Sequence, residues 1–183
     1  MTAPTVPAPA PPTLRIWRAG LLIVSLWALA IAAAAVLHEP WAVRRAALFL
    51  HLASLVAGFG AVLVADFQGV LWLRGRRRLA DMLLVTEALH PVIWGGLVGL
   101  VVSGVLLRPN LTLPRTLIKL ALLLVVALNG LWATRLSDRL RRQQAQVPDD
   151  VDQRLLAQVM VSGAISQAGW WIATLIGFLA TTS

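Results

Sequence analysis

Four polar residues stand within long apolar stretches of this sequence, and their types and spacing could support chemistry. Glu87 and His90 are three residues apart, so in a helix their side chains share one face. Such a pair can bind a metal ion in a helical bundle when neighbouring helices add ligands. Asp66 and Asn129 fall at a similar estimated depth, so we predict that the four residues form an inner polar level that binds a metal ion.

Two other interpretations of this inner level stay open. Glu87 and His90 could hydrogen bond to each other and so neutralise a polar patch within the membrane. Alternatively, Asp66, Glu87 and His90 could relay protons, since ionisable residues in membrane helices often have such roles.

A second polar level is expected near the opposite surface, where His51, Ser103 and Lys119 lie. His51 could be an axial ligand of haem or copper, and Lys119 could pair with a haem propionate or another anion. The competing interpretation is that Lys119 extends to the interface and His51 makes one interhelical hydrogen bond. His51 and His90 differ in estimated depth by about 15 Å, so we do not expect them to share one haem iron.

The elements that position these residues are five apolar stretches, each near the roughly 20 residues that a transmembrane helix needs. They run over 17–37, 46–73, 83–107, 117–133 and 155–179. The sequence therefore predicts an all-α membrane bundle, with four helices as its core and the first helix packed outside. We expect residues 1–13 to form a disordered cytoplasmic tail and residues 14–183 a single transmembrane domain.

Three details refine this plan. Residues 137–153 are expected to form a solvated loop, with a cap that starts the fifth helix. Small residues at four-residue spacing predict close helix contacts, which membrane helices need because lipid supplies no hydrophobic drive between them. These residues are Gly95, Gly99 and Ser103, and Gly169, Ala173 and Gly177.

Composition and charge agree with a membrane protein. Hydrophobic residues make up 58% of the chain and charged residues 13%, and the absence of Cys excludes disulfides and thiolate metal sites. The net charge of +8 comes from basic residues in the expected loops, which argues against a nucleic-acid surface. By the positive-inside rule, the loops richest in Arg predict a cytoplasmic N-terminus and a C-terminus outside. Residues 74–78 could also attract anionic lipid headgroups.

Several short motifs lie in the expected helices between about residues 45 and 135. They are Leu50-His51-Leu52 followed by Gly58 and Gly60, Gly95-Gly96, Ser103-Gly104-Val105-Leu106-Leu107, and Ile118-Lys119-Leu120-Ala121-Leu122 through Asn129. This pattern resembles the copper-resistance D family, and it is similar to the membrane-type protoporphyrinogen oxidases of bacterial haem synthesis. The resemblance implies haem contact for His51 and Lys119. The chain departs from the oxidase pattern in its additional N-terminal helix, its lack of Tyr, and Asp66.

Together, the residues and the resemblance predict a multi-pass protein of the bacterial inner membrane that binds haem b or a copper-type transition metal ion. Its role would be redox chemistry or metal handling, and its partners the lipid bilayer, a second copy of the chain or a membrane redox partner. Two alternatives come from other classes. One is a non-catalytic accessory or structural subunit, and the other is a proton-coupled carrier that uses Asp66, Glu87 and His90.

Overall fold

The structure is a computed structural model that describes residues 12–37, 40–146 and 151–180. Its described part is all-α and contains no strand. The helices are α1 (Pro12–Val36), α2 (Trp41–Leu73), α3 (Leu79–Leu106), α4 (Pro114–Gln146) and α5 (Gln153–Leu179). Each of the five is long and apolar enough to cross a membrane. The prediction of an all-α protein with five transmembrane helices is therefore confirmed.

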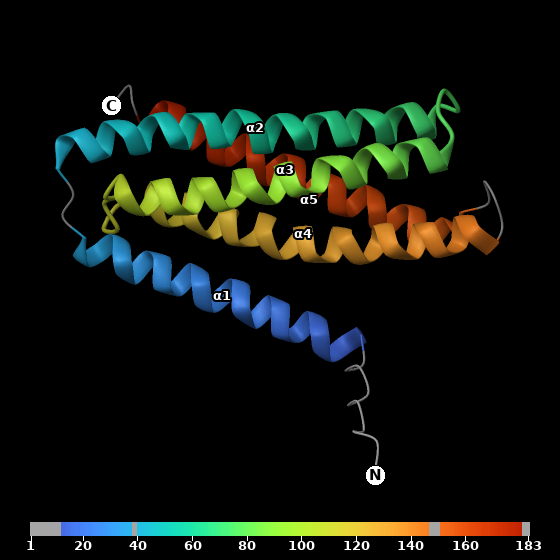
Figure 1. Cartoon of the computed structure of the whole chain (residues 1–183), viewed down its shortest axis with the longest axis horizontal. Helices are drawn as coiled ribbons and strands as arrows, with labels where there is room; N and C mark the ends of the chain where they lie inside the picture. Colours follow the sequence, from blue (N-terminus) through green and yellow to red (C-terminus); the bar gives the residue numbers. More distant parts are fainter. Residues whose placement is uncertain (1–11, 38–39, 147–150, 181–183) are drawn as a thin grey trace, which may run out of the picture.

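Helices α2 to α5 lie side by side, and α1 leans away from them toward its N-terminal end (Figure 1). α2 packs mainly on α3 and α4 mainly on α5, so the core consists of two helical hairpins. α1 contacts α3 and α4, and the indole nitrogen of Trp27 donates to the carbonyl oxygen of Leu120 at 3.2 Å. Among the described side chains of α1, only Ala34 is buried. The predicted four-helix core with a peripheral first helix is thus present.

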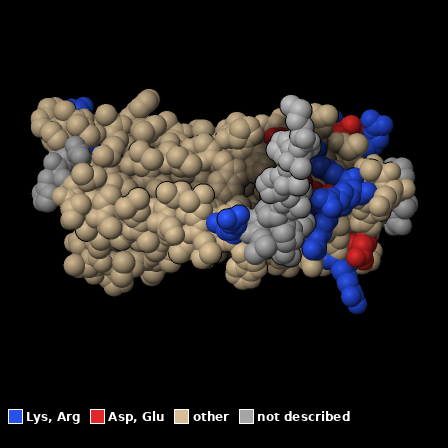
Figure 2. Space-filling view, turned by 60° about the horizontal axis from the view of Figure 1, so that its bottom comes forward, with Lys and Arg blue, Asp and Glu red and all other residues tan. Residues whose placement is uncertain are grey.

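The two ends of the bundle differ in charge. The basic end comprises the α2–α3 loop, the last turns of α4 and the first turn of α5, and the far end comprises the start of α2 and the α3–α4 loop. The basic end holds Arg74, Arg76, Arg77, Arg78, Arg135, Arg139, Arg141, Arg142 and Arg154. Figure 2 shows Lys and Arg side chains gathered toward one end of the molecule, next to a long uncharged stretch. That uncharged stretch is the surface suited to lipid acyl chains.

Close packing of α2 on α3 depends on two glycines. A Cβ built on Gly96 would lie 2.7 Å from the backbone nitrogen of Gly58, and one on Gly58 would lie 3.1 Å from Cα of Gly96. The two backbones therefore touch, as small residues allow in membrane helices. A Cβ on Gly95 meets no atom within 4 Å, so the predicted contact at Gly95 is wrong by one residue. Gly99 and Ser103 do face α2 as predicted.

The second predicted stripe of small residues, on α5, is correct at one end only. A Cβ built on Gly169 would collide with the side chain of Val126 on α4, so this glycine lies at the α4–α5 contact. A Cβ on Gly177 would meet nothing within 4 Å, so Gly177 is not at a close helix contact.

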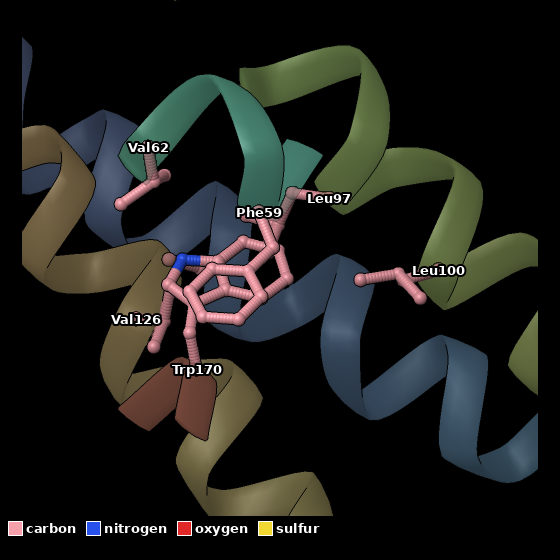
Figure 3. Close-up of a cluster of buried hydrophobic side chains, with 7 residues drawn as sticks. Phe59, Val62, Leu97, Leu100, Val126 and Trp170 are labelled. Atoms are coloured by element: carbon pink, nitrogen blue, oxygen red, sulfur yellow. The ribbon is translucent and has the colours of Figure 1, made fainter. Parts of the chain in front are cut away.

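Apolar side chains from all four core helices close the middle of the bundle. This central cluster consists of Phe59, Val62, Leu97, Leu100, Val126, Ala127 and Trp170. The rings of Phe59 and Trp170 stack with centroids 5.5 Å apart and an interplanar angle of 6° (Figure 3). Trp171 meets Phe59 edge to face, with centroids 5.0 Å apart. The cluster separates a far half of the bundle, which contains His51, from a basic half.

α4 continues well beyond its predicted end at Ala133, as far as Gln146. The loop predicted over 137–153 is therefore wrong for residues 137–146, whereas 147–150 lie outside the described residues. The reason is tertiary packing. Leu136 and Leu140, one turn apart, are both buried in a second apolar cluster at the basic end, and such burial stabilises a helix beyond its local propensity.

The boundaries of α5 and α1 can also be compared with the sequence. The predicted cap of the fifth helix is confirmed, since the side chain of Asp152 accepts a hydrogen bond from the backbone nitrogen of Arg154 at 3.1 Å. α1 begins at Pro12, so it includes the last two residues of the predicted tail. Residues 1–11 lie outside the described part, and the tail stays a prediction there.

Candidate functional site

A cavity of about 670 Å³ lies between the two hairpins in the basic half of the bundle. We call it the inner cavity. All four residues of the predicted inner level line it, and they come from α2, α3 and α4: Asp66, Glu87, His90 and Asn129. Val62, Leu97 and Val126 of the central cluster close the cavity toward the far end. The structure thus brings the four residues around one space, although each has its own hydrogen-bond partner.

Two polar pairs link the hairpins across the inner cavity. On α2 and α5, the amide nitrogen of Gln167 donates to a carboxylate oxygen of Asp66 at 2.6 Å. On α3 and α4, Arg141 donates to Glu87, also at 2.6 Å, and to the carbonyl oxygen of Leu83 at 3.2 Å. Glu87 is therefore paired with a cation, whereas the carboxylate of Asp66 has a neutral partner.

His90 contacts two neighbours other than Glu87 and accepts a hydrogen bond from one of them. The indole nitrogen of Trp94 donates to His90 Nε2 at 2.6 Å, and the hydroxyl of Thr134 lies 3.3 Å from the same nitrogen. An indole N–H can only donate, so Nε2 accepts and the proton of the neutral ring is on Nδ1. The hydroxyl of Thr134 donates to the carbonyl oxygen of Gly130 at 2.9 Å. The lone pair through which His90 Nε2 could bind a metal is therefore engaged.

Asn129 joins α4 to α5. Its amide nitrogen donates to the carbonyl oxygen of Ser162 at 2.9 Å, and the hydroxyl of Ser162 donates to its amide oxygen at 3.1 Å. Both residues are buried. This reciprocal pair satisfies polar groups that would otherwise be costly to bury, so it holds the second hairpin together.

These contacts bear on the predicted metal site. Among the described residues, no three His, Asp or Glu side chains form a group that could hold a metal ion. Asp66, Glu87 and His90 each have another partner, which leaves the inner level without a set of converging ligands. Metal binding at these residues therefore has no support in the geometry and stays a prediction.

Several residues of this site were not singled out from the sequence. Gln167 and Ser162 are polar residues within an apolar stretch, and that signal could have identified them. Arg141 gave no such signal, because the sequence placed it in a loop. Its contact with Glu87 exists only because α4 continues as a helix alongside α3.

The outer polar group consists of His51, Ser103 and Lys119 in the far half of the bundle. His51 Nδ1 lies 2.9 Å from the hydroxyl oxygen of Ser103. That hydroxyl donates to the carbonyl oxygen of Gly99, so it accepts the Nδ1 proton of His51. Lys119 is partly buried. One direct contact therefore joins His51 and Ser103, and the place of Lys119 in this group stays a prediction.

The two imidazoles differ in which nitrogen remains available. His90 uses Nε2 to accept from Trp94, whereas His51 uses Nδ1 to donate to Ser103 and has no hydrogen bond at Nε2 within the described part of the chain. Histidines that bind metals usually anchor one ring nitrogen in this second manner and present the other. His51 therefore has the orientation expected of a metal ligand, and His90 does not.

Comparison with known proteins gives no match to a family model, to a curated protein or to a solved structure. The resemblance of residues 45–135 to the two haem- and copper-related families therefore stays a prediction. The structure shows an integral membrane protein whose described residues form five helices able to span a membrane, with a largely apolar cavity between its two hairpins.

Proposed function

We propose that this integral membrane protein binds an amphipathic organic molecule in the inner cavity. The observation that carries the proposal is the convergence of polar groups from four helices on one largely apolar space of about 670 Å³. Sites for small molecules typically have volumes of about 300–1,000 Å³, apolar walls and a few polar groups that orient the ligand. Cavities between the helices of a bundle are common places for such sites.

The position of the cavity suggests how a ligand reaches it. On the basic side of the central cluster, α3 and α4 contact each other over a short length, as do α2 and α5, so few backbone contacts close the cavity at these two sides. Glu87 and Arg141, the pair that links α3 to α4, are both partly accessible, with 65% and 38% of their side chains exposed. A ligand from the basic end or the adjacent membrane surface would therefore enter beside this ion pair.

A fluorescent ligand tests the proposal. Phenylnaphthylamine is neutral and apolar, and it becomes bright in such cavities, so the purified full-length protein should bind it saturably. The substitution Gly163→Leu should weaken binding at least about tenfold, since a Cβ there meets only Asp66 at 3.9 Å and the larger side chain fills the cavity. Gly177→Leu on the same helix is the matched control and should leave binding unchanged. Equal binding by both variants would contradict the proposal.

Haem or copper binding at His51 is a second candidate, favoured by the anchored Nδ1 and available Nε2 of that imidazole. His51 would be the axial ligand and Lys119 would pair with an anionic group such as a propionate. A bound haem would supply one-electron redox chemistry.

Absorption spectroscopy and metal analysis of the purified protein test this second candidate. A Soret band that His51→Ala removes and His90→Ala retains would support it. A colourless, metal-free sample that is still folded would refute it, and the proposal for the inner cavity would be unaffected.

We also propose that the basic end faces the cytoplasm of a bacterial inner membrane, because cytoplasmic loops are enriched in Arg and Lys. The chain contains no Cys, so single cysteines can report the orientation. An impermeant maleimide added to whole cells should label Asn110→Cys in the α3–α4 loop and should not label Arg76→Cys in the α2–α3 loop. The reverse pattern would overturn the assignment.

A further inference from the structure

We propose that the inner cavity selects an organic cation, with the carboxylate of Asp66 as its counter-ion. This inference rests on the proposed function, because it names the class of ligand that the same cavity takes. Its basis is the charge of the cavity wall, its aromatic side chains and an unpaired hydrogen-bond donor.

The charged side chains that line the cavity are mostly acidic. The carboxylates are Asp66, Glu87 and Asp138, and the guanidinium is that of Arg141. Three negative charges and one positive charge leave the wall at a formal −2, although the whole chain carries +8. Glu87 is neutralised by Arg141 at 2.6 Å. Asp66 has Gln167 as its hydrogen-bond partner and no cation within ion-pair distance among the described residues. A carboxylate in an apolar span is costly unless it is protonated or paired, and a bound cation would pair with it.

The aromatic wall fits a cation as well. Trp72, Trp94 and Trp170 all line the cavity. The faces of Trp rings attract cations more strongly than those of other aromatic residues, and aromatic walls are a common means of recognising quaternary ammonium groups. A cavity that contains three indoles and an uncompensated carboxylate therefore combines the two features that bind such a group.

Trp170 adds an independent observation. It is 3% exposed, and its Nε1 is a buried donor without a hydrogen-bond partner. Figure 3 shows this nitrogen on the side of Val62, a residue that lines the cavity, and away from Leu100. A buried N–H without an acceptor is costly. Neighbouring side chains cover this nitrogen, so a ligand with an acceptor atom near its cationic centre would satisfy it once those side chains shift.

The lining of the inner cavity does not suit a bare metal cation as ligand. Hard divalent cations need six or more oxygen ligands, or a few ligands together with retained water. One carboxylate oxygen of Glu87 accepts from Arg141, the amide oxygen of Asn129 accepts from Ser162, and most of the remaining wall is apolar. An organic cation instead places its apolar body against this surface and needs one counter-ion.

A matched pair of ions tests the inference. Tetraphenylphosphonium and tetraphenylborate have nearly the same size and shape and carry opposite charges. The full-length protein in phosphatidylcholine nanodiscs should bind the phosphonium at least about tenfold more tightly than the borate, after subtraction of binding to empty nanodiscs. Asp66→Asn, which retains an oxygen acceptor for Gln167, should weaken phosphonium binding by a similar factor. Asp81→Asn removes a carboxylate outside the cavity and should leave binding within about twofold.

The possible outcomes separate this inference from the proposed function. If phenylnaphthylamine binds but the phosphonium shows no preference over the borate, the cavity takes a ligand and its selectivity for cations is refuted. If phosphonium binding is unchanged by Asp66→Asn, Asp66 is not the counter-ion. If neither phenylnaphthylamine nor the phosphonium binds, the proposed function fails as well. Even if Asp66→Asn does not fold, the comparison of the two ions on the unaltered protein decides whether the cavity selects cations.

Discussion

At the level of the central cluster, the backbones of α2 and α3 touch within the first hairpin, whereas on the basic side of this cluster the two hairpins stand apart around the inner cavity. In the first region the contact is made by glycine, with Gly58 and Gly96 facing each other. In the second, long polar side chains such as Arg141 and Gln167 bridge the space between helices. Tight backbone packing leaves no room for a ligand, so the contact of α2 with α3 holds the first hairpin together, and the space between the hairpins is the proposed binding site.

The strongest test of this division is the close contact of α2 and α3. Gly96→Ala should lower the free energy of unfolding in detergent by about 3 kcal/mol or more, because the new Cβ meets backbone atoms that cannot move aside. Gly95→Ala is the neighbouring control and should change it by no more than about 0.5 kcal/mol, since the space around Gly95 is open. Similar unfolding midpoints for the two variants would show that the contact does not stabilise the bundle.

A smaller effect is expected where α4 meets α5. Asn129→Leu should cost about 1–2 kcal/mol of unfolding free energy, because Ser162 loses both of its contacts with Asn129. A double-mutant cycle with Ser162→Ala should give a coupling of about 0.6–1.7 kcal/mol, the range seen for hydrogen bonds between membrane helices. If the changes in unfolding free energy of the two substitutions simply add, the contact between Asn129 and Ser162 does not contribute to stability.

The smallest effect on stability is expected at the entrance to the cavity. Glu87→Gln removes a partly exposed ion pair with Arg141, and pairs of this kind contribute about 0.2–1 kcal/mol. Thermal unfolding should therefore change little, while phenylnaphthylamine should enter and leave faster in stopped-flow measurements, because α3 and α4 lose their ionic link. Unchanged rates would mean that ligands enter elsewhere, such as between α2 and α5.

The sequence predicted the helices and the position of the site along the bundle, and both predictions have a physical basis. The length of an apolar stretch is dictated by the thickness of the bilayer, and it does not depend on tertiary contacts. The cost of placing charge in lipid likewise draws Asp66 and His90 toward the interior of the bundle, where the structure has them. The prediction failed at residues 137–146, because a polar helix that is stabilised by two buried leucines resembles a loop in sequence.

The partners of the site residues could not be predicted. Spacing placed Glu87 and His90 on one face of α3, and the contact between them was a natural expectation. In the structure, Glu87 instead reaches Arg141 and His90 reaches Trp94. The choice depends on how α3 is turned relative to α4 and on whether α4 extends that far, and neither property is encoded within a single helix.

By itself, then, the sequence determined the number of membrane-spanning helices, their solvent and the common level of Asp66, Glu87, His90 and Asn129. Only the tertiary structure decided which of these side chains meet, that Asp66 lacks a cation, and that a cavity separates the hairpins. The physical reason lies in helices that are apolar on nearly every side, because their patterns specify no preferred face. Their rotation is set by sites of closest approach such as Gly58 and Gly96, which exist only once two helices are packed together.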